Sequence, residues 1–407
     1  MKQIRNVSMF FCMAFAALNA QWVQTSGPSE HTVLSLAVCD SVLIAGTYSG
    51  AYVSTDKGDH WAAAGSINYL GIRVLALAVM DNLVFAGTDE GVYRSSDNGT
   101  SWKAIDSGLP DRALVHSIAV SGTSVYAGTH AQGVFISVDS GATWTAINSG
   151  LPATTSVYSL FARGNQVIAG TWGAGIFRSA NNGTTWTAAN SGLPASAIGG
   201  YAFSLVSCGA DLFSAIGSGI YSSHDNGASW SPAGSSLIFS DVYSLIASEP
   251  DLFAATYSDG VFYSADYGLS WKAINTGLPV NNQGQCLLTS GAYLFFGTGN
   301  NGVFRRPLAE ISSIKSPMTS RSKFSFKVVL VGRFHRIMSV EFSLPRSQTV
   351  SILMNSMTGS KISVLADGHF DAGAHRISYN VATGPGCYMV KMKTESGESF
   401  QNIALVK

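Results

Sequence analysis

Charged side chains are scarce in this sequence. Asp, Glu, Lys and Arg make up only 12% of the 407 residues, against 46% hydrophobic residues, so the chain can bury a large core and is not expected to be disordered. The few charges are unevenly divided. Residues 21–310 carry 10 Lys and Arg against 19 Asp and Glu, whereas residues 311–407 carry 12 against 5. Because nucleic-acid affinity rests on cations that neutralise phosphates, the acidic body argues against nucleic acid as a partner.

Long apolar runs are missing beyond the N-terminus. Residues 1–20 read MKQIRN, then VSMFFCMAFAAL, then NA. That order is typical of a secretory signal peptide cleaved after Ala20, and its apolar core is too short to span a bilayer. No later stretch approaches about 18 consecutive apolar residues. We therefore expect a mature chain without a transmembrane segment, which is secreted or held at the cell surface.

Cysteine and histidine are too few and too scattered for a metal centre. The 8 histidines show none of the close His or Cys spacings that zinc requires, and no phosphate-binding loop or Ser-His-Asp arrangement is identifiable. The sequence thus predicts no metal and no cofactor. Outside the signal peptide, which holds Cys12, the cysteines are Cys39, Cys208, Cys286 and Cys387. Cys39 and Cys208 occupy equivalent turns of separate repeats, which favours buried free thiols over disulfides.

What the sequence has in abundance is an internal repeat. The pattern S-x-D-x-G-x-x-W, here called the box, occurs five times, and a sixth copy has Asn181 in the place of Asp. The copies are STDKGDHW (54–61), SSDNGTSW (95–102), SVDSGATW (137–144), SANNGTTW (179–186), SHDNGASW (223–230) and SADYGLSW (264–271). Their tryptophans are 41 to 44 residues apart. A repeat of this length is sought first because it decides the fold.

Each repeat holds four short strand-like runs. In the second repeat these are VLALAV, NLVFAGT, GVYRS and WKAIDSG, separated by Gly, Asn and Asp turns. About 41 residues for four strands is typical of a β-propeller blade. The second strands, from LIAGT at 43–47 to LFFGT at 294–298, number seven. Seven blades are therefore expected.

The seventh repeat lacks its box, because Arg306 stands where the Ser should be and Pro307 follows. The N-terminal segment QWVQTSGP (21–28) matches the Trp-bearing segment WKAIDSGLP of the second repeat. It can supply the missing outer strand and a seventh equivalent tryptophan, Trp22. Such closure removes unpaired sheet edges. We predict an all-β fold, with a seven-bladed β-propeller over residues 21–310 that is closed by an N-terminal strand.

The box residues fit a structural role. The turn needs a positive φ at Gly99, Asp97 and Ser95 can accept hydrogen bonds from turn amides, and Trp102 can bury about 150 to 250 Å². Asn181 accepts hydrogen bonds as Asp does, whereas a catalytic carboxylate would not tolerate that exchange. The residues assigned this structural role are Asp56, Asp97, Asp139, Asn181, Asp225, Asp266, Trp61, Trp102, Trp144, Trp186, Trp230 and Trp271.

With these boxes, residues 21–310 resemble the Asp-box (BNR-like) propellers. That group includes sialidases, xyloglucan-cleaving glycoside hydrolases, sortilin-type receptors and photosystem II assembly factors. The resemblance implies that the boxes lie at the blade periphery, on the face away from the ligand. It agrees with the structural role that the residues themselves suggest.

The C-terminal part of the chain has a different composition. Residues 311–323, ISSIKSPMTSRSK, are polar and Ser-rich, which predicts a linker. Alternating strand-like segments follow, so we predict a small immunoglobulin-like β-sandwich over 324–407.

This tail resembles the type A C-terminal sorting domain of the bacterial type IX secretion system. The matching pieces are VEFSLP (340–345), MTGSKISVL (357–365), DAGAHRISY (371–379), Gly386 with Tyr388, and the terminal Lys407. The resemblance implies the type IX machinery as a partner and export across a bacterial outer membrane. The tail would then be cleaved or exchanged for a surface anchor. An ordinary accessory sandwich is the alternative.

A propeller ligand is expected where strand two turns into strand three and where one blade passes to the next. The residues directly after strand two are Tyr48, Asp89, His130, Trp172, Gly217, Tyr257 and Gly299. Four of these are aromatic or imidazole, which suggests a platform that stacks on a sugar or holds a partner's side chain. Tyr69 and Tyr201, in blade-to-blade connections, can join it. The alternatives are that these are ordinary isolated surface aromatics and, for His116 on strand one, a packed core histidine.

The residues expected on this face give little support to an enzymatic function. A sialidase needs an arginine cluster, but only Arg73 and Arg112 are expected here, and the Arg-Ile-Pro motif is absent. The xyloglucan-cleaving type uses a cleft between two propellers, whereas this chain has one. The carboxylates available for an inverting pair are Glu30, Asp89, Glu90, Asp111, Asp241 and Asp259.

Three hypotheses follow. The first is a secreted or cell-surface, non-enzymatic binding or scaffold propeller that recognises a carbohydrate or an extracellular protein. The second is a glycoside hydrolase, xyloglucanase-like or sialidase-like, that acts on extracellular polysaccharide. The third, an assembly factor of the photosystem type, is disfavoured by the sorting tail.

Overall fold

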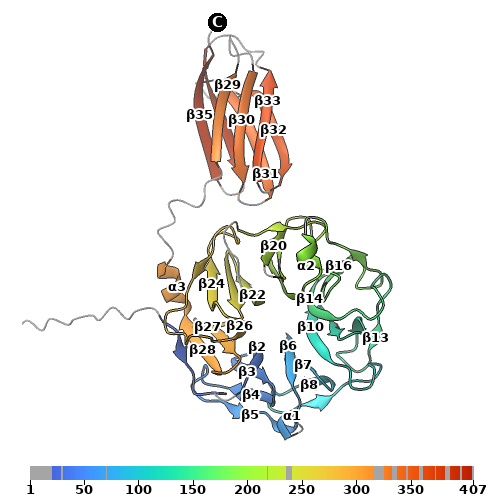
Figure 1. Cartoon of the computed structure of the whole chain (residues 1–407). Helices are drawn as coiled ribbons and strands as arrows, with labels where there is room; N and C mark the ends of the chain where they lie inside the picture. The colour runs from blue at the N-terminus through green and yellow to red at the C-terminus, as the bar shows by residue number, and fades with distance from the viewer. Residues whose placement is uncertain are drawn as a thin grey trace, which may run out of the picture.

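The structure is a computed structural model, and its elements are drawn in Figure 1. The described residues are 21–28, 31–69, 71–217, 219–234, 241–314, 325–331, 337–344, 347–356, 361–371, 373–380, 386–394 and 397–405. The expected signal peptide, Glu30, Lys407 and most of the expected linker lie outside them. Among the described residues, no helix has the length and apolar character needed to cross a membrane.

Seven four-stranded antiparallel sheets form the propeller. Blades 1 and 2 consist of β2 (Val33–Cys39), β3 (Val42–Thr47), β4 (Gly50–Ser54), β5 (Ala62–Ala63), β6 (Val74–Met80), β7 (Leu83–Thr88), β8 (Gly91–Ser95) and β9 (Lys103–Ala104). Blades 3 and 4 consist of β10 (Val115–Ser121), β11 (Ser124–Thr129), β12 (Val134–Ser137), β13 (Thr145–Ala146), β14 (Val157–Arg163), β15 (Gln166–Thr171), β16 (Ile176–Ser179) and β17 (Thr187–Ala188).

The remaining blades follow the same order. Blades 5 and 6 consist of β18 (Ala202–Cys208), β19 (Asp211–Ile216), β20 (Gly219–Ser223), β21 (Ser231–Pro232), β22 (Val242–Ser248), β23 (Asp251–Thr256), β24 (Val261–Ser264) and β25 (Lys272–Ala273). Blade 7 combines β26 (Gly284–Ser290), β27 (Tyr293–Thr298) and β28 (Val303–Pro307) with β1 (Val23–Gln24). Helix α1 (Gly65–Tyr69) connects blades 1 and 2, and α2 (Ala195–Ile198) connects blades 4 and 5.

The all-β, seven-bladed fold is confirmed, and so is its closure. β1 pairs antiparallel with β28, with Val23 opposite Arg305 and Gln24 opposite Phe304. Figure 1 shows the blue N-terminal strand beside the orange strands of the last blade. Trp22 is 2% exposed and its indole Nε1 donates to the Ile274 carbonyl at 2.6 Å. The two ends of the propeller sequence therefore share one sheet.

Small residues at the end of strand two let neighbouring blades pack closely. A Cβ at Gly46 would lie 2.3 Å from Ser35 Oγ and 2.6 Å from the Val74 side chain of the next blade. The following residue, Thr47, donates from Oγ1 to the Gly50 carbonyl at 2.9 Å and thereby fixes the turn into β4. The same threonine bond occurs at Thr88, Thr129, Thr171, Thr256 and Thr298. The recurring Ala-Gly-Thr of the sequence thus reflects both packing and turn geometry.

The propeller ends in a helix. Helix α3 (Leu308–Ile314) follows β28 directly, and Ile311 is buried in the apolar cluster that also holds Trp22 and Phe304. The first four residues of the expected linker therefore belong to this helix. Arg306, in the place of the missing box serine, is buried and donates from Nη1 to the Ile274 carbonyl at 2.9 Å.

Two sheets form the C-terminal β-sandwich. One has the strand order β29-β30-β33 and the other β32-β31-β34-β35. The strands are β29 (Ser325–Val331), β30 (Ile337–Leu344), β31 (Gln348–Ser356), β32 (Lys361–Phe370), β33 (Gly373–Asn380), β34 (Gly386–Thr394) and β35 (Gly397–Leu405). Alternate residues of β31, Val350, Ile352 and Met354, are fully buried in its core. Period-two burial of this kind is typical of a strand with one buried face.

Each box forms the turn between strands three and four. In blade 3, Ser137 Oγ donates to Asp139 Oδ1 at 2.7 Å, and the Gly141 amide donates to Ser137 Oγ at 2.8 Å. The Thr143 amide and hydroxyl donate to the two oxygens of Asp139, at 2.9 and 2.7 Å. The carboxylate is therefore occupied by its own turn, as expected of a residue that shapes the chain.

The asparagine copy of the box keeps this geometry with one change. The Thr185 amide donates to Asn181 Oδ1 at 3.0 Å, as its counterparts do to aspartate. The second bond is reversed, because Asn181 Nδ2 donates to Thr185 Oγ1 at 2.9 Å. Since a hydroxyl both donates and accepts, the turn tolerates the exchange of Asp for Asn.

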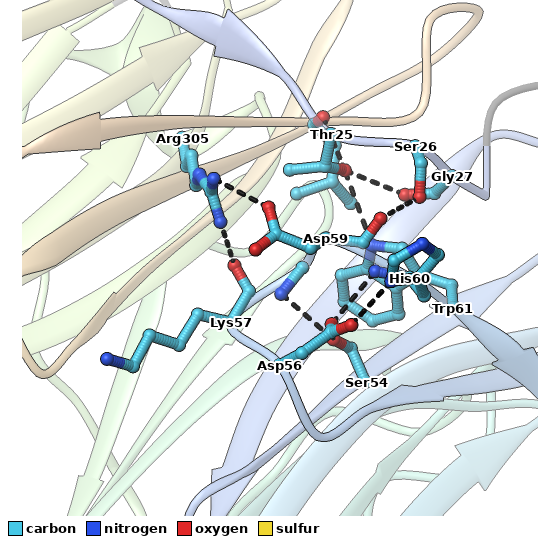
Figure 2. A network of polar contacts seen from close by, with 12 residues as sticks. Thr25, Ser26, Gly27, Ser54, Asp56, Lys57, Asp59, His60, Trp61 and Arg305 are labelled. Carbon is cyan, nitrogen blue, oxygen red and sulfur yellow. Dashed lines mark hydrogen bonds and ion pairs between the residues drawn. The ribbon is translucent and has the colours of Figure 1, made fainter.

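The first box also contacts β28 and the residues that follow the closing strand, since Trp61 Nε1 lies 3.3 Å from Thr25 Oγ1 (Figure 2). His60 donates from its backbone amide to Asp56 Oδ1 at 2.8 Å, and its ring Nδ1 lies 2.6 Å from Asp56 Oδ2. Arg305 of β28 donates to the Lys57 carbonyl at 2.7 Å and pairs with Asp59 at 2.7 Å. The box turn of blade 1 is therefore held by β28 of blade 7.

The box carboxylates predict an acid sensitivity of the propeller. Hydrogen bonds from the Thr143 amide and hydroxyl lower the pKa of Asp139 to about 2. A lowered carboxylate pKa contributes stability that is present above the ordinary value of about 3.9 and is lost as the pH falls toward about 2. We expect the melting temperature of the full chain to fall between pH 5 and pH 2.5, as followed by circular dichroism.

Two reciprocal variants test the source of that sensitivity. Asp139→Asn should reduce the fall in melting temperature between the two pH values, because the amide cannot be protonated in this range. Asn181→Asp should increase it, since Thr185 can then donate to a carboxylate. Equal pH dependence in both variants and the parent would refute the assignment.

Candidate functional site

The two faces of the propeller differ in what their turns carry. The boxes lie on the same face as the turns between strands one and two, as shown by Asn98 Nδ2 donating to Asp40 Oδ2 at 3.3 Å. The turns between strands two and three, and the connections between blades, lie on the opposite face. That opposite face, around the axis of the ring, is here called the mouth.

The residues predicted to face a ligand occupy equivalent positions in the mouth. In every blade the residue after strand two donates its amide to the carbonyl of the residue before strand one, at 2.8 to 3.3 Å. The seven pairs are Tyr48 with Thr32, Asp89 with Arg73, His130 with Leu114, Trp172 with Ser156, Gly217 with Tyr201, Tyr257 with Asp241, and Gly299 with Gln283. This ladder fixes the backbone from which each side chain projects.

Several of the predicted side chains are open to solvent. Tyr48 and Trp172 are each 48% exposed and Tyr257 is 41% exposed. His130 is also exposed, whereas Tyr201 is half-buried. The side chain of Tyr69, in α1, lies outside the described part of the chain.

The rings of Trp172 and Tyr201 stack almost parallel in the mouth. Their ring centroids are 5.3 Å apart and their planes differ by 1°. The two residues also form an isolated antiparallel bridge between blades 4 and 5. Tyr201 in turn stacks on Phe203 at 5.0 Å and 5°. The half-exposed indole of Trp172 is therefore one member of a stack that also contains Tyr201 and Phe203.

The ring contacts continue into blade 6. Phe203 of β18 lies 4.5 Å from Tyr243 of β22, centroid to centroid, and Tyr243 lies 5.6 Å from Tyr257. Burial raises the pKa of Tyr243, and the Asp241 carboxylate, Tyr257, Tyr201 and Tyr48 raise it further.

In the other direction the contacts reach blade 3. Tyr158 of β14 meets Tyr201 edge-on at 5.0 Å and stacks on His116 at 4.2 Å. His116 meets His130 at 5.7 Å. Burial lowers the pKa of His116 to about 4, with smaller contributions from His130 and Arg73. His116 is thus neutral at physiological pH and packs as an aromatic ring.

These rings form one set of contacts across four blades, here called the aromatic arc. Its members are His130, His116, Tyr158, Trp172, Tyr201, Phe203, Tyr243 and Tyr257. The structure joins the predicted His130, Trp172, Tyr201 and Tyr257 within it. Tyr158, Phe203 and Tyr243 were not predicted as ligand-face residues from the sequence. They share the second position of strand one, so an alignment of that strand holds the signal.

Tyr48 has a different neighbour. The Arg73 guanidinium lies 6.0 Å from the centroid of the Tyr48 ring. Arg73 also donates from Nε to Asp89 Oδ2 at 2.8 Å and from its backbone amide to Asp89 Oδ1 at 2.9 Å. In the same region Arg112 donates from Nε to Glu90 at 2.8 Å. Both arginines expected on this face are therefore held by carboxylates.

Among the described residues, no group of three His, Cys, Asp or Glu side chains is arranged to hold a metal ion. Cys39, Cys208 and Cys286 are buried and form no disulfide, as the equivalent repeat positions of Cys39 and Cys208 predicted for those two. Burial raises the pKa of the Cys286 thiol well above its ordinary value. These thiols are packing residues of the blades.

Comparisons with known proteins agree on the fold. The model of the DUF6242 beta propeller domain matches residues 24–167 and 77–208. No curated protein matches the chain. Solved structures are similar in fold at 18% sequence identity or less.

Three of these solved structures illustrate the range of propellers that share the fold. YCF48 bound to a D1 peptide has a TM-score of 0.56 at 18% identity, over 71% of this chain and 96% of that one. The GH74 xyloglucanase from Xanthomonas campestris has a TM-score of 0.58 at 15% identity, over 80% and 59%. PorZ, a surface component of the type IX secretion system of Porphyromonas gingivalis, has a TM-score of 0.54 at 13% identity, over 95% and 61%.

Proposed function

We propose that this chain is a secreted or cell-surface, non-enzymatic binding propeller that recognises a carbohydrate or an extracellular protein with its mouth. The observation that carries the proposal is the aromatic arc. Aromatic rings bind ligands by stacking and by burying apolar area. Rings that already pack on each other lose little conformational freedom when a ligand binds, which favours affinity.

The route to the cell surface is proposed from the two ends of the chain. The N-terminal 20 residues have the order of a signal peptide, and the C-terminal sandwich resembles a type IX sorting domain. Export by a bacterial type IX secretion system would account for both features. In this proposal the boxes are Asp boxes on the face opposite the mouth, so the mouth is free to bind a partner.

Hydrolysis of a glycan has less support from the contacts. Asp89 and Glu90, two of the carboxylates on the proposed ligand face, are engaged by Arg73 and Arg112. A general acid needs a raised pKa, and a base needs access to water. Carboxylates in ion pairs fit neither role well. We therefore expect binding without release of product.

Replacement of Trp172 tests the binding face. Trp172→Ala is expected to weaken ligand binding by about 1 to 3 kcal/mol, the range for an aromatic hot spot. Because half of the indole is in solvent, the melting temperature should change little. Trp172→Phe, which keeps a ring on Tyr201, should retain most of the affinity.

The measurement starts from a glycan array and a screen of extracellular peptides with the full-length mature chain. Affinities of any retained ligand are then compared between the parent and the two variants. Unchanged binding by Trp172→Ala would disprove the role of the mouth. Released oligosaccharide during incubation would favour the glycoside hydrolase instead.

A further inference from the structure

Four Asn-Gly pairs in this chain invite a spontaneous change of the backbone. In such a pair the backbone nitrogen of glycine can attack Cγ of the asparagine side chain, and ammonia leaves as a cyclic imide forms. Glycine favours the attack because it has no Cβ to obstruct the approach. The pairs are Asn98-Gly99, Asn182-Gly183, Asn226-Gly227 and Asn301-Gly302.

Three of the pairs lie in boxes, where the serine hydroxyl holds the nitrogen that would attack. In the second box, the Gly99 amide donates to Ser95 Oγ at 2.9 Å. The same bond, at 2.8 to 2.9 Å, occurs in two further boxes, from Gly183 to Ser179 and from Gly227 to Ser223. The amide must give up this hydrogen bond before its nitrogen can attack, and the loss costs free energy.

The backbone of these three boxes also turns the amide away from the asparagine side chain. Asn98, Asn182 and Asn226 have φ values of 55 to 58°, in the left-handed region where ψ is about +30 to +60°. At such ψ values the next amide nitrogen lies opposite Cβ across the Cα–C bond. Cγ can therefore reach that nitrogen only after the backbone rotates.

The fourth pair lies outside the boxes, in the β27–β28 turn of the mouth. A hydroxyl again stands four residues before the glycine, but it is used differently. Thr298 Oγ1 accepts from the Asn301 amide at 3.0 Å and donates to the Gly302 carbonyl at 2.8 Å. Within the described residues the Gly302 amide donates to no acceptor, and φ of Asn301 is not positive. Asn301 thus lacks both features that protect the box asparagines.

We propose that Asn301 is a site of spontaneous deamidation in the folded chain, and that the box serines protect the other three asparagines from it. The Gly302 nitrogen forms a bond to Asn301 Cγ, the Cγ–Nδ2 bond breaks, and the Gly302 amide proton leaves with Nδ2 as ammonia. Water then opens the imide to aspartate or isoaspartate. The reaction needs no oxidant or reductant, and the inference does not depend on the proposed function.

The product places a carboxylate in the mouth, beside the closing strand. The Asn301 carbonyl accepts from Gln24 Nε2 at 2.8 Å, and Gln24 of β1 lies opposite Phe304 of β28. Opening of the imide at its backbone carbonyl gives isoaspartate, whose main chain is longer by one methylene group. Deamidation therefore alters the turn to which Gln24 is bonded.

The test compares the four pairs within one protein. The full-length mature chain is incubated at mildly alkaline pH, and the mass increase at each asparagine is followed by mass spectrometry of proteolytic peptides. Asn301 is expected to react at least about fivefold faster than the three box asparagines, the effect of one hydrogen bond to the attacking amide. The chain unfolded in guanidinium is the control, since the four rates should then become similar.

Ser95→Ala tests the protection directly. Without the hydroxyl, Asn98 is expected to react about 2- to 10-fold faster. Asn182 and Asn226, which keep their own serines, should retain their rates and serve as internal controls for the fold. If the variant loosens the whole ring, Asn98 should still accelerate more than these two.

Each part of the inference can fail separately. Equal rates at the four pairs of the folded chain, or no reaction at Asn301 while the unfolded chain reacts, overturn the assignment of the site. A difference that persists in guanidinium overturns it too, because the fold is then not its cause. If Ser95→Ala leaves the rate at Asn98 unchanged, or accelerates all three box asparagines equally, the serines do not protect them.

Discussion

Trp22→Ala is expected to lower the free energy of unfolding by about 3 to 5 kcal/mol, the range for removal of a buried large aromatic side chain. Trp22 is 2% exposed, its Nε1 donates to the Ile274 carbonyl at 2.6 Å, and its ring lies 5.7 Å from that of Phe296. The variant leaves a cavity at the sheet whose strands come from both ends of the propeller sequence. Urea unfolding followed by tryptophan fluorescence and circular dichroism measures the loss.

The matched control is Trp61→Ala, the equivalent tryptophan of blade 1. Its indole is only half-buried, and its Nε1 lies 3.3 Å from Thr25 Oγ1. A smaller loss of stability is expected for Trp61→Ala, because the folded protein buries less of the apolar area of this side chain. If the Trp22 variant unfolds at the same urea concentration as the parent, the closing strand does not stabilise the ring.

The second large effect is expected at Gly150, in the segment Asn-Ser-Gly-Leu-Pro that follows blade 3. A Cβ at Gly150 would lie 2.2 Å from the carbonyl oxygen of Trp186, and φ is +95°. Overpacking costs about 1 to 3 kcal/mol and a left-handed backbone about 1 to 2 kcal/mol. Gly150→Ala should therefore lower the free energy of unfolding by about 2 to 5 kcal/mol, measured by urea unfolding.

Gly164→Ala is the control for the backbone contribution. Gly164 also has a positive φ, of +59°, but a Cβ there meets nothing within 4 Å. Gly164→Ala should lose only the stability that a left-handed backbone costs a residue with a Cβ, without the cost of overpacking. Equal losses in the two variants would show that the close approach of Gly150 to Trp186 is unimportant.

This close approach recurs between blades and explains a motif of the sequence. Gly108, Gly192 and Gly277 would place a Cβ 2.0 to 2.4 Å from the carbonyls of Trp144, Trp230 and Trp22. In blade 4, the Trp186 amide donates to the Ser149 carbonyl at 2.8 Å beside this contact. The recurring Ser/Thr-Gly-Leu-Pro is thus the place where the outer strand of one blade meets the tryptophan of the next.

Trp102 of the second box packs against two blades. It donates to Gly99 of its own box at 2.9 Å, and its apolar cluster holds Val84 and Ala86 of its own blade as well as Cys39 and Ile44 of blade 1. The sequence shows that the tryptophan recurs, but its contacts with residues about 60 positions earlier are decided only by the tertiary structure.

The sequence by itself determined the all-β class, the number of blades and the closing strand, because each follows from a periodic pattern along one chain. It also singled out His130, Trp172, Tyr201 and Tyr257. Only the tertiary structure decided that these rings touch through Phe203, Tyr243, Tyr158 and His116. The physical reason is that the first strands of successive blades meet around one axis, so residues about 40 positions apart become neighbours there.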